Sequence, residues 1–332
     1  MKKLLAVLIV VGISFFGYAL KLYPPVDNPR VTSTFGEYRP LGSRGPHFHM
    51  GLDFSTARRI GIDIKSAADG YLDRIVIDKD DIYGYVVVLV HEGGYKTLYA
   101  HMSDFAPAVK ELTDDLEKEF NGERVIVQFH PDDVIFKKGD VIGKSGSTGE
   151  AMKPHCHFEV RDEEEKASYD PMLFLAGVPR PIDEKVVLDK ISVGSTVMSF
   201  VDGGEYEFKG DFPKLEILSY SIGNGNRLGL KDIKYYLNGS LIYELSFSKI
   251  DWLDFGNVSY VYDGEKSRMN VEEYVAWYKL YPIDLEANLS MIKVNRFSEI
   301  KRFPDVANVR IILEDAWGMK KEARIVLRRV GD

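Results

Sequence analysis

The segment Pro154-His155-Cys156-His157-Phe158-Glu159-Val160 predicts a β-strand, because polar and apolar side chains alternate along its second half. Side chains two residues apart share one face of a strand. We therefore expect the imidazoles of His155 and His157 to project together, with their Cα atoms about 7 Å apart. Cys156 then points to the opposite, buried face and acts as a small apolar residue. Its alternative role, as a thiolate ligand or nucleophile, is disfavoured because the alternation directs its side chain away from both histidines.

Short β-strand patterns separated by glycine surround this segment, from residue 25 to residue 175. One helix is expected among them, at residues 107–120. Pro107 stands in its first turn, apolar residues recur on one of its faces, and Asn121-Gly122 ends it. Since this helix follows His101 closely, one hypothesis is that it restricts access to a site nearby. A helix without such a role is the alternative.

A stiff Pro179-Arg180-Pro181 connection leads to a second β-rich region, which we expect to span residues 182–332. Asn238-Gly239 stands between two alternating runs, which is the strongest short signal for a hairpin. A second hairpin is expected around Trp317-Gly318, and a helix near residues 271–278, capped by the preceding asparagine. Several short strands over this length predict a β-sandwich of immunoglobulin-like type.

The N-terminus has the pattern of a secretory signal peptide over residues 1–19. Lys2 and Lys3 form a basic start, residues 4–16 are apolar, and Gly17-Tyr18-Ala19 fits a cleavage site. The apolar stretch of about 13 residues is short for a membrane span of roughly 20. We therefore expect export to the periplasm, the cell envelope or the extracellular space. A retained N-terminal membrane anchor is the alternative.

Composition excludes several classes of protein. The chain has 332 residues, with 43 Lys and Arg against 51 Asp and Glu, so its formal net charge of −8 gives it no electrostatic reason to bind nucleic acid. The 45% hydrophobic and 28% charged residues are those of a globular protein, and the length is enough for two domains. Cys156 is the only cysteine, which excludes an intramolecular disulfide and a cysteine-based zinc finger.

All seven histidines precede residue 160, so we expect any acid–base site in the first region. They are His47, His49, His91, His101, His130, His155 and His157. His49 and Asp53 lie four residues apart, which is about 13 Å in a straight strand. Two ligands of one zinc ion must lie much closer together, so the chain has to bend between them, and Gly51 permits a bend. A salt-bridged or core pair is the alternative explanation of this spacing.

Five motifs occur in order along the first region. They are Ser33-Thr34-Phe35-Gly36, His49-x-Gly51-x-Asp53, Ala67-Ala68-Asp69-Gly70, Gly93-Gly94-Tyr95-Lys96-Thr97-Leu98-Tyr99-Ala100-His101, and the segment Pro154 to Val160. Together they resemble the lysostaphin-like (LytM-type) zinc metallopeptidases, which cleave peptidoglycan peptides, over residues 33–175. The resemblance implies an open antiparallel β metallopeptidase domain with a groove, which we place at residues 20–178. The expected fold is thus mainly β, with one inserted helix and a C-terminal sandwich.

Matched residue by residue, the resemblance implies that His49, Asp53 and His157 bind one Zn²⁺ per chain and that His101 and His155 are catalytic. Three protein ligands leave the fourth zinc position open, as in catalytic sites. The sequence contains no His-Glu-x-x-His helix to supply a glutamate base, so a neutral histidine must accept the proton. His155 is best placed for this role, with His101 assisting or stabilising the oxyanion.

The chain departs from the family pattern in three places. Glu37 interrupts the usual Phe-Gly-Tyr-Arg run, which leaves the role of Tyr38 open, and Cys156 replaces an aliphatic residue. The insertion over residues 107–133 is longer than its family counterpart. His47 is expected either to support a zinc ligand or only to flank the groove, whereas turn and surface positions are expected for the histidines at 91 and 130.

The function expected from these residues is that of an exported zinc metalloendopeptidase acting on the peptide cross-links of peptidoglycan. One alternative is a non-catalytic adaptor that uses the groove to bind or activate a cell-wall amidase. Such an adaptor would be expected to lack zinc ligands. Another alternative is an endopeptidase that acts on secreted proteins or peptides. The second region contains no histidine or cysteine, so we expect it to act by binding or packing and not by chemistry.

Overall fold

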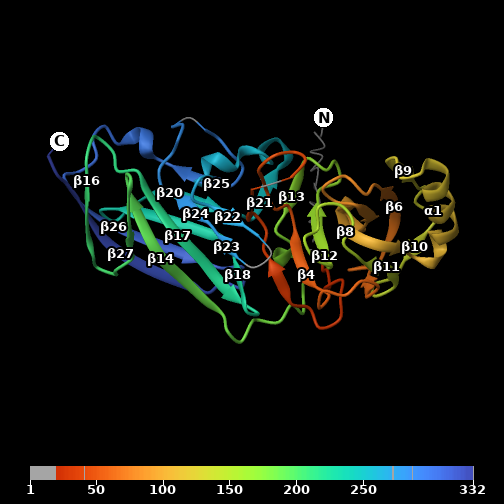
Figure 1. Ribbon diagram of the computed structural model, residues 1–332. Helices are drawn as coiled ribbons and strands as arrows, with labels where there is room; N and C mark the ends of the chain where they lie inside the picture. The colour runs from red at the N-terminus through yellow and green to blue at the C-terminus, as the bar shows by residue number, and fades with distance from the viewer. Residues whose placement is uncertain (1–19, 41, 271–272, 286, 332) are drawn as a thin grey trace, which may run out of the picture.

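The computed structural model describes residues 20–40, 42–270, 273–285 and 287–331. Two β-rich regions lie side by side along the long axis of an elongated molecule, the first ending in α1 and the second in the C-terminus (Figure 1). The expected signal peptide falls outside the described residues. Within them, no helix has the length and apolar character needed to cross a membrane.

The first region is built on a 12-stranded sheet whose central order is β1-β4-β12-β8-β7-β6-β10. All of the strand pairs in this sheet are antiparallel. The elements of the region are β1 (Val31–Ser33), β2 (Tyr38–Arg39), β3 (His47–Phe48), β4 (Leu52–Ser55), β5 (Asp63–Lys65), β6 (Gly70–Ile77), β7 (Tyr85–Val90), η1 (Glu92–Gly94), β8 (Lys96–Phe105), α1 (Pro107–Phe120), β9 (Val125–Gln128), β10 (Ile135–Phe136), β11 (Val141–Ser145), β12 (His155–Arg161), β13 (Ala167–Tyr169) and η2 (Pro171–Leu173). The expected mainly β fold with an inserted helix is therefore confirmed.

Strand β12 lies in the middle of this sheet, between β4 and β8. Its apolar side chains alternate onto the buried face, where Phe158 packs edge-on against Phe54 of β4 and also contacts Tyr99 of β8. Cys156 is buried on this face with 1% of its surface exposed, as the alternation predicts, and burial raises the pKa of its thiol. The opposite face of β12 carries the two histidines and Glu159.

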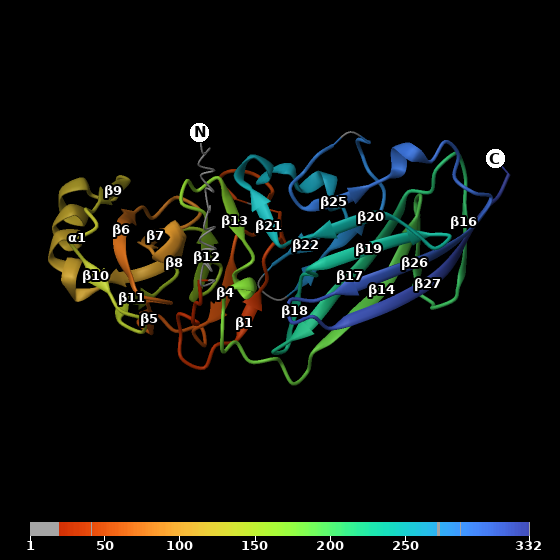
Figure 2. The ribbon, with the colours of Figure 1, turned by 180° about the vertical axis from the view of Figure 1, so that it is seen from behind.

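The second region consists mainly of two further sheets, which pack against one another through their apolar faces. One has the order β15-β14-β17-β18 with β24 beside β17, and the other the order β16-β27-β26-β19-β20-β25. The elements are β14 (Lys185–Val193), β15 (Thr196–Ser199), β16 (Glu205–Phe208), β17 (Leu215–Gly223), β18 (Asn226–Leu228), β19 (Asp232–Leu237), β20 (Ser240–Ser246), β21 (Lys249–Asp251), η3 (Trp252–Asp254), η4 (Asn257–Tyr260), β22 (Arg268–Met269), β23 (Tyr274–Val275), β24 (Trp277–Lys279), β25 (Ile292–Asn295), η5 (Phe297–Glu299), β26 (Val306–Glu314) and β27 (Lys320–Arg329). Figure 2 shows both sheets from behind.

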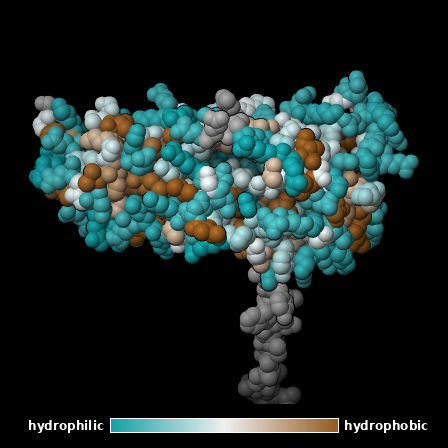
Figure 3. Space-filling model, turned by 60° about the horizontal axis from the view of Figure 1, so that its bottom comes forward, coloured by the Kyte–Doolittle hydropathy of each residue, from teal (hydrophilic) through white to brown (hydrophobic). Residues whose placement is uncertain are grey.

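Both hairpins expected in this region are confirmed. Asn238-Gly239 joins β19 to β20, and the turn containing Trp317-Gly318 joins β26 to β27. The immunoglobulin-like type of the sandwich stays a prediction. On the face seen in Figure 3, apolar side chains form scattered patches among hydrophilic ones rather than one continuous band.

The helix expected near residues 271–278 is wrong. Residues 271 and 272 lie outside the described part, and the rest of the segment forms β23 and β24. The side chain of Asn270 accepts a hydrogen bond from the N–H of Glu273 at 2.9 Å, as an N-cap would. Here, however, this bond lies in the connection between β22 and β23, which form a hairpin, and β24 pairs with β17. Asn270 thus makes the hydrogen bond expected of an N-cap. No helix follows in the described residues, because β24 pairs with the distant strand β17 instead.

The two regions share a β-sheet and a hydrophobic core. Strand β21 of the second region pairs with β13 at an edge of the 12-stranded sheet. Phe247 packs so closely against Gly36 that a Cβ at that position would lie 2.3 Å from the phenyl ring. One continuous cluster of buried apolar side chains runs through both regions. The orientation of one region on the other is therefore set by packed side chains.

We predict that Asp170→Asn stabilises the protein at neutral pH. Asp170 follows β13 and is 2% exposed, and burial raises the pKa of its carboxyl to about 6. Because this pKa exceeds the unfolded value of 3.8, the carboxyl favours the folded state at low pH. That contribution is lost as pH rises from about 4 to 6. Asparagine keeps the acceptor for the N–H of Met172, so we expect a gain of about 3 kcal/mol above pH 6. Urea unfolding from pH 4 to 7 tests this, and identical pH dependence in both proteins would contradict it.

Candidate metal centre and groove

Three neighbouring strands bring the expected site residues together. In the sheet, His157 of β12 stands opposite Asp53 of β4 and opposite Ala100 of β8, the residue before His101. Gly51 lets the chain turn between His49 and β4, because a Cβ there would lie 2.3 Å from a backbone oxygen of β12. Asp53 and His157, which are 104 positions apart in the chain, are thus neighbours on adjacent strands of the sheet.

His49, Asp53 and His157 direct one atom each toward a common point. The Nε2 of His49, the Oδ1 of Asp53 and the Nδ1 of His157 lie 3.0 Å from one another in all three pairs. Ligand atoms bound at about 2.0–2.2 Å to one tetrahedral ion lie roughly 3.3 Å apart. All three residues are buried, and they form a group able to hold a metal ion.

The hydrogen bonds of the two imidazoles test whether a cation fits this triangle. His49 donates from Nδ1 to the carbonyl oxygen of Thr34 at 2.8 Å, so its Nε2 presents a lone pair. His157 donates from Nε2 to the buried carboxylate of Glu159 at 2.9 Å, so its Nδ1 faces the other two atoms. Carboxylates that orient a ligating histidine in this way are typical of zinc sites. A single proton cannot satisfy three acceptors, whereas one cation can.

The charges around the triangle also favour a cation. Although burial alone would lower it, the carboxylates of Asp53 and Glu159 raise the pKa of His157 to about 9. Burial would also raise the pKa of Asp53, but the neighbouring imidazoles of His49 and His155 lower it well below its usual value. Two carboxylates beside the triangle thus favour a positive charge between them, and the donor set of two imidazoles and one carboxylate fits Zn²⁺.

The remaining two imidazoles of the site lie beside the triangle. The ring centroids of His101 and His155 are 4.6 Å apart, and the Nε2 of His155 lies 3.4 Å from the Oδ1 of Asp53. Each donates from Nδ1 to a backbone carbonyl, of Thr148 and Lys153 respectively, which leaves each Nε2 free to accept a proton.

His101 is held in an unusual backbone conformation. Its φ of 60° is left-handed, which costs of order 1–3 kcal/mol for a residue that is not glycine. Burial, with the nearby rings of His155 and His157, holds the pKa of His101 well below its usual value. The imidazole is therefore neutral at pH 7, as a proton acceptor must be.

Arg39, which the sequence did not assign to the site, lies against Asp53, and Glu37 lies behind Arg39. Arg39 donates to the Oδ2 of Asp53 at 3.3 Å and also to the Oε2 of Glu37 at 2.9 Å. Glu37 was noted only as a departure from the family pattern, and no local signal showed its contacts. The Glu159 carboxylate was missed too, although its position two residues after His157 on one strand face could have indicated it.

A groove of about 1150 Å³ opens over the five site residues. Both regions line it, the first around the metal ligands and the second through residues that include Arg227, Phe255 and Glu273. No residue of the 107–133 insertion is among its lining residues, and α1 lies at the far end of the molecule (Figure 1). The hypothesis that this helix restricts access to the site is therefore wrong.

The other histidines have separate roles. His47 lines the groove and stacks on Phe255 of the second region with ring centroids 4.7 Å apart, and burial lowers its pKa to about 4. His91 is buried at the turn before η1, where it bonds to Asp69 and Thr97. His130 lies on the surface of the insertion, as expected.

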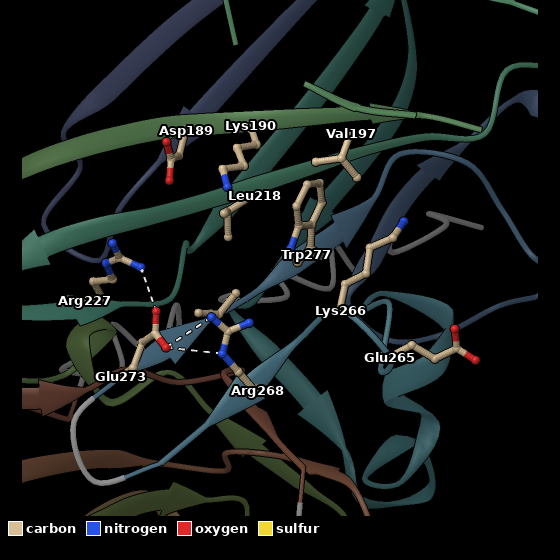
Figure 4. A pocket seen from close by; sticks show the side chains of 11 residues that line it. Asp189, Lys190, Val197, Leu218, Arg227, Glu265, Lys266, Arg268, Glu273 and Trp277 are labelled. Atoms are coloured by element: carbon tan, nitrogen blue, oxygen red, sulfur yellow. Dashed lines mark hydrogen bonds and ion pairs between the residues drawn. The ribbon is translucent and has the colours of Figure 1, made fainter. Parts of the chain in front are cut away.

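A smaller cavity of about 430 Å³ lies on the second region and shares Arg227 and Glu273 with the groove. Figure 4 shows Glu273 between two guanidinium groups, those of Arg227 at 3.7 Å and Arg268 at 3.2 Å. Trp277 forms part of the cavity wall. The two cavities are therefore neighbours that meet at one charged pair.

Comparison with known proteins finds similarity within the first region. Residues 47–115 match the description of Peptidase family M23. The chain is 28% identical over 137 residues to DD-carboxypeptidase/endopeptidase Mpg of Neisseria meningitidis serogroup B, covering 41% of this chain and 25% of that protein. It is 31% identical over 140 residues to peptidoglycan DD-endopeptidase ShyB of Vibrio cholerae, covering 41% and 26%. The match thus spans only about a quarter of each of these relatives.

Among solved structures, the catalytic domain of lysostaphin from Staphylococcus simulans is similar at 24% identity and a TM-score of 0.32. That match covers 44% of this chain and 92% of the other.

Proposed function

We propose that the protein is an exported zinc metalloendopeptidase of the lysostaphin-like type that hydrolyses peptide cross-links of peptidoglycan; its residues 47–115 match peptidase family M23. The observation that carries this proposal is the convergence of His49, Asp53 and His157 on one point, beside two further imidazoles in an open groove. The peptidoglycan endopeptidases among the relatives support the substrate class.

Zinc, when bound, would polarise the scissile carbonyl and make a water molecule more acidic. The protein supplies the proton transfers. His155 accepts the proton of the attacking water at Nε2 and returns it to the leaving amine, since its Nδ1 is occupied by the carbonyl of Lys153. His101, whose Nδ1 is likewise occupied by a backbone carbonyl, assists the transfer through its Nε2, and it stabilises the oxyanion once that nitrogen has taken up a proton.

A complete set of site residues distinguishes this proposal from a non-catalytic adaptor. All three ligands and both further histidines are present and lie together. An adaptor that only binds a cell-wall amidase has no need of the buried Glu159 carboxylate that orients His157.

Substrate assays separate peptidoglycan from secreted proteins. The purified protein, loaded with zinc, is offered cell-wall sacculi, isolated cross-linked muropeptides and an unfolded protein. We expect cleavage of the first two at a peptide cross-link and little digestion of the third. Preferential digestion of the unfolded protein would instead support an endopeptidase for secreted proteins.

We predict that Arg227→Gln weakens the binding of long substrates. Arg227 comes from the second region, lines the groove, and stacks on Tyr220 with its guanidinium 4.3 Å from the ring centroid. Its side chain is 37% exposed, so it can pair with a substrate carboxylate. We expect KM to rise roughly 10-fold for cross-linked muropeptides, corresponding to the loss of one charge-assisted hydrogen bond. For short peptides that do not reach it, kcat/KM should stay unchanged, and equal losses on both substrates would contradict this.

A further inference from the structure

A buried carboxylate joins the second region to the loop before the metal ligands. Glu37 is 2% exposed. Its Oε1 accepts hydrogen bonds from the N–H of Gly229 at 2.9 Å and from the N–H and hydroxyl of Thr34 at 2.7 and 2.8 Å. Gly229 lies in the second region, 192 positions along the chain. One oxygen of Glu37 thus joins its own loop, through Thr34, to Gly229 of the second region.

The other oxygen of Glu37 leads to the metal ligands. Its Oε2 accepts from the Nη1 of Arg39 at 2.9 Å, and the Nη2 of Arg39 donates to the Oδ2 of Asp53 at 3.3 Å. The Oδ1 of Asp53 is the atom that faces His49 and His157. The rigid guanidinium fork therefore fixes which carboxylate oxygen of Asp53 turns toward the metal.

We infer that the second region holds Asp53 in its metal-binding orientation through the chain of hydrogen bonds Gly229–Glu37–Arg39. This inference rests on the proposed function, since it concerns the same zinc site. Glu37 and Arg39 are positioning residues, which act on the metal only through Asp53. Outer partners of this kind change metal affinity roughly 10–100-fold when they are removed.

Neighbouring contacts fix the same loop from the same side. The hydroxyl of Tyr262 donates to the backbone oxygen of Gly36 at 2.8 Å, and the hydroxyl of Tyr274 accepts from the N–H of Tyr38 at 3.3 Å. Both tyrosines belong to the second region. The backbone is thus fixed on both sides of Glu37. If Gly229 pushes the Glu37 carboxylate aside, the loop cannot shift to compensate, so the hydrogen bond from Arg39 to Glu37 is disturbed.

Glu37→Gln separates the two functions of the carboxylate. The amide oxygen of glutamine can keep the three bonds to Gly229 and Thr34, while its NH₂ group replaces the acceptor that Arg39 uses. We expect a folded protein whose Kd for zinc rises roughly 10–100-fold, measured by competition with a chromophoric chelator. The increase in melting temperature on adding zinc should shrink accordingly.

Gly229→Ala tests the chain from the second region. The φ of Gly229 is ordinary, but a Cβ there would lie 2.7 Å from the Cγ of Glu37, so the carboxylate must move. Gly256→Ala is the matched control, because Gly256 also lies in the second region with an ordinary φ and has no neighbour within 4 Å of a new Cβ. We expect weaker zinc binding for Gly229→Ala and the wild-type Kd for Gly256→Ala.

Two outcomes would overturn the inference. In the first, both Glu37→Gln and Gly229→Ala bind zinc with the wild-type Kd while the wild type hydrolyses peptidoglycan; the proposed function then stands and only the coupling fails. In the second, the zinc-free melting temperature falls but the Kd for zinc does not change, which shows a structural role alone. A wild type that binds no zinc would instead refute the proposed function, and the coupling with it.

Discussion

His157→Ala is expected to yield largely metal-free and inactive protein. The substitution removes one of three ligands and also the donor that pairs with the buried Glu159 carboxylate. Losing a ligand from a site of three protein ligands leaves too few donors to retain zinc at catalytic sites. Metal analysis of the purified variant, with circular dichroism to confirm folding, measures the effect. The zinc content should fall from about one ion per chain to near zero.

His91→Ala is the control for this variant. His91 is a buried histidine with two hydrogen bonds, but it lies outside the groove. Its loss should lower the melting temperature while the zinc content stays at the wild-type value. If His157→Ala is folded and keeps its zinc, His157 is not a ligand and the proposed site is wrong.

His155→Ala is expected to be folded, loaded with zinc and nearly inactive. The Nε2 of His155 lies near Asp53 but outside the triangle of ligand atoms, so its loss leaves the donor set intact. General-base catalysis contributes roughly 10²–10⁴-fold, and kcat should fall by that factor. The rate of release of soluble muropeptides measures the loss.

Two further histidine variants show whether the loss of rate in His155→Ala is specific to that residue. His101→Ala should behave like His155→Ala if His101 acts on the transition state, and like wild type if it is structural. His130→Ala, on the exposed surface of the insertion, should leave both zinc content and rate unchanged. If His155→Ala loses zinc while His157→Ala keeps it, the two roles are inverted.

Local sequence signals predicted much of the fold. The alternation from 157 to 160 correctly put both histidines of β12 on one face and Cys156 on the other, because strand geometry depends only on neighbouring residues. The helix Pro107–Phe120 was predicted at about these bounds, since a proline at its start and Asn-Gly at its end mark both termini.

Long-range contacts account for what the sequence did not show. β21 joins the sheet of the first region by pairing with β13, more than 80 residues away, and no local pattern encodes such a partner. Glu37 looked like an interruption of a motif because its partner Gly229 is even more remote, at 192 positions along the chain. The ligand set was predicted only by resemblance, since the spacing of His49 and Asp53 also fits a simple ion pair.

The most direct test of the account is the digestion of purified sacculi by the wild-type protein as isolated, after removal of metal with a chelator, and after restoration of zinc. The account predicts soluble muropeptides whose masses identify a hydrolysed peptide cross-link, no release after chelation, and recovery on adding zinc in proportion to the zinc bound. Zinc-loaded, folded protein that releases no fragments from sacculi or muropeptides would contradict it.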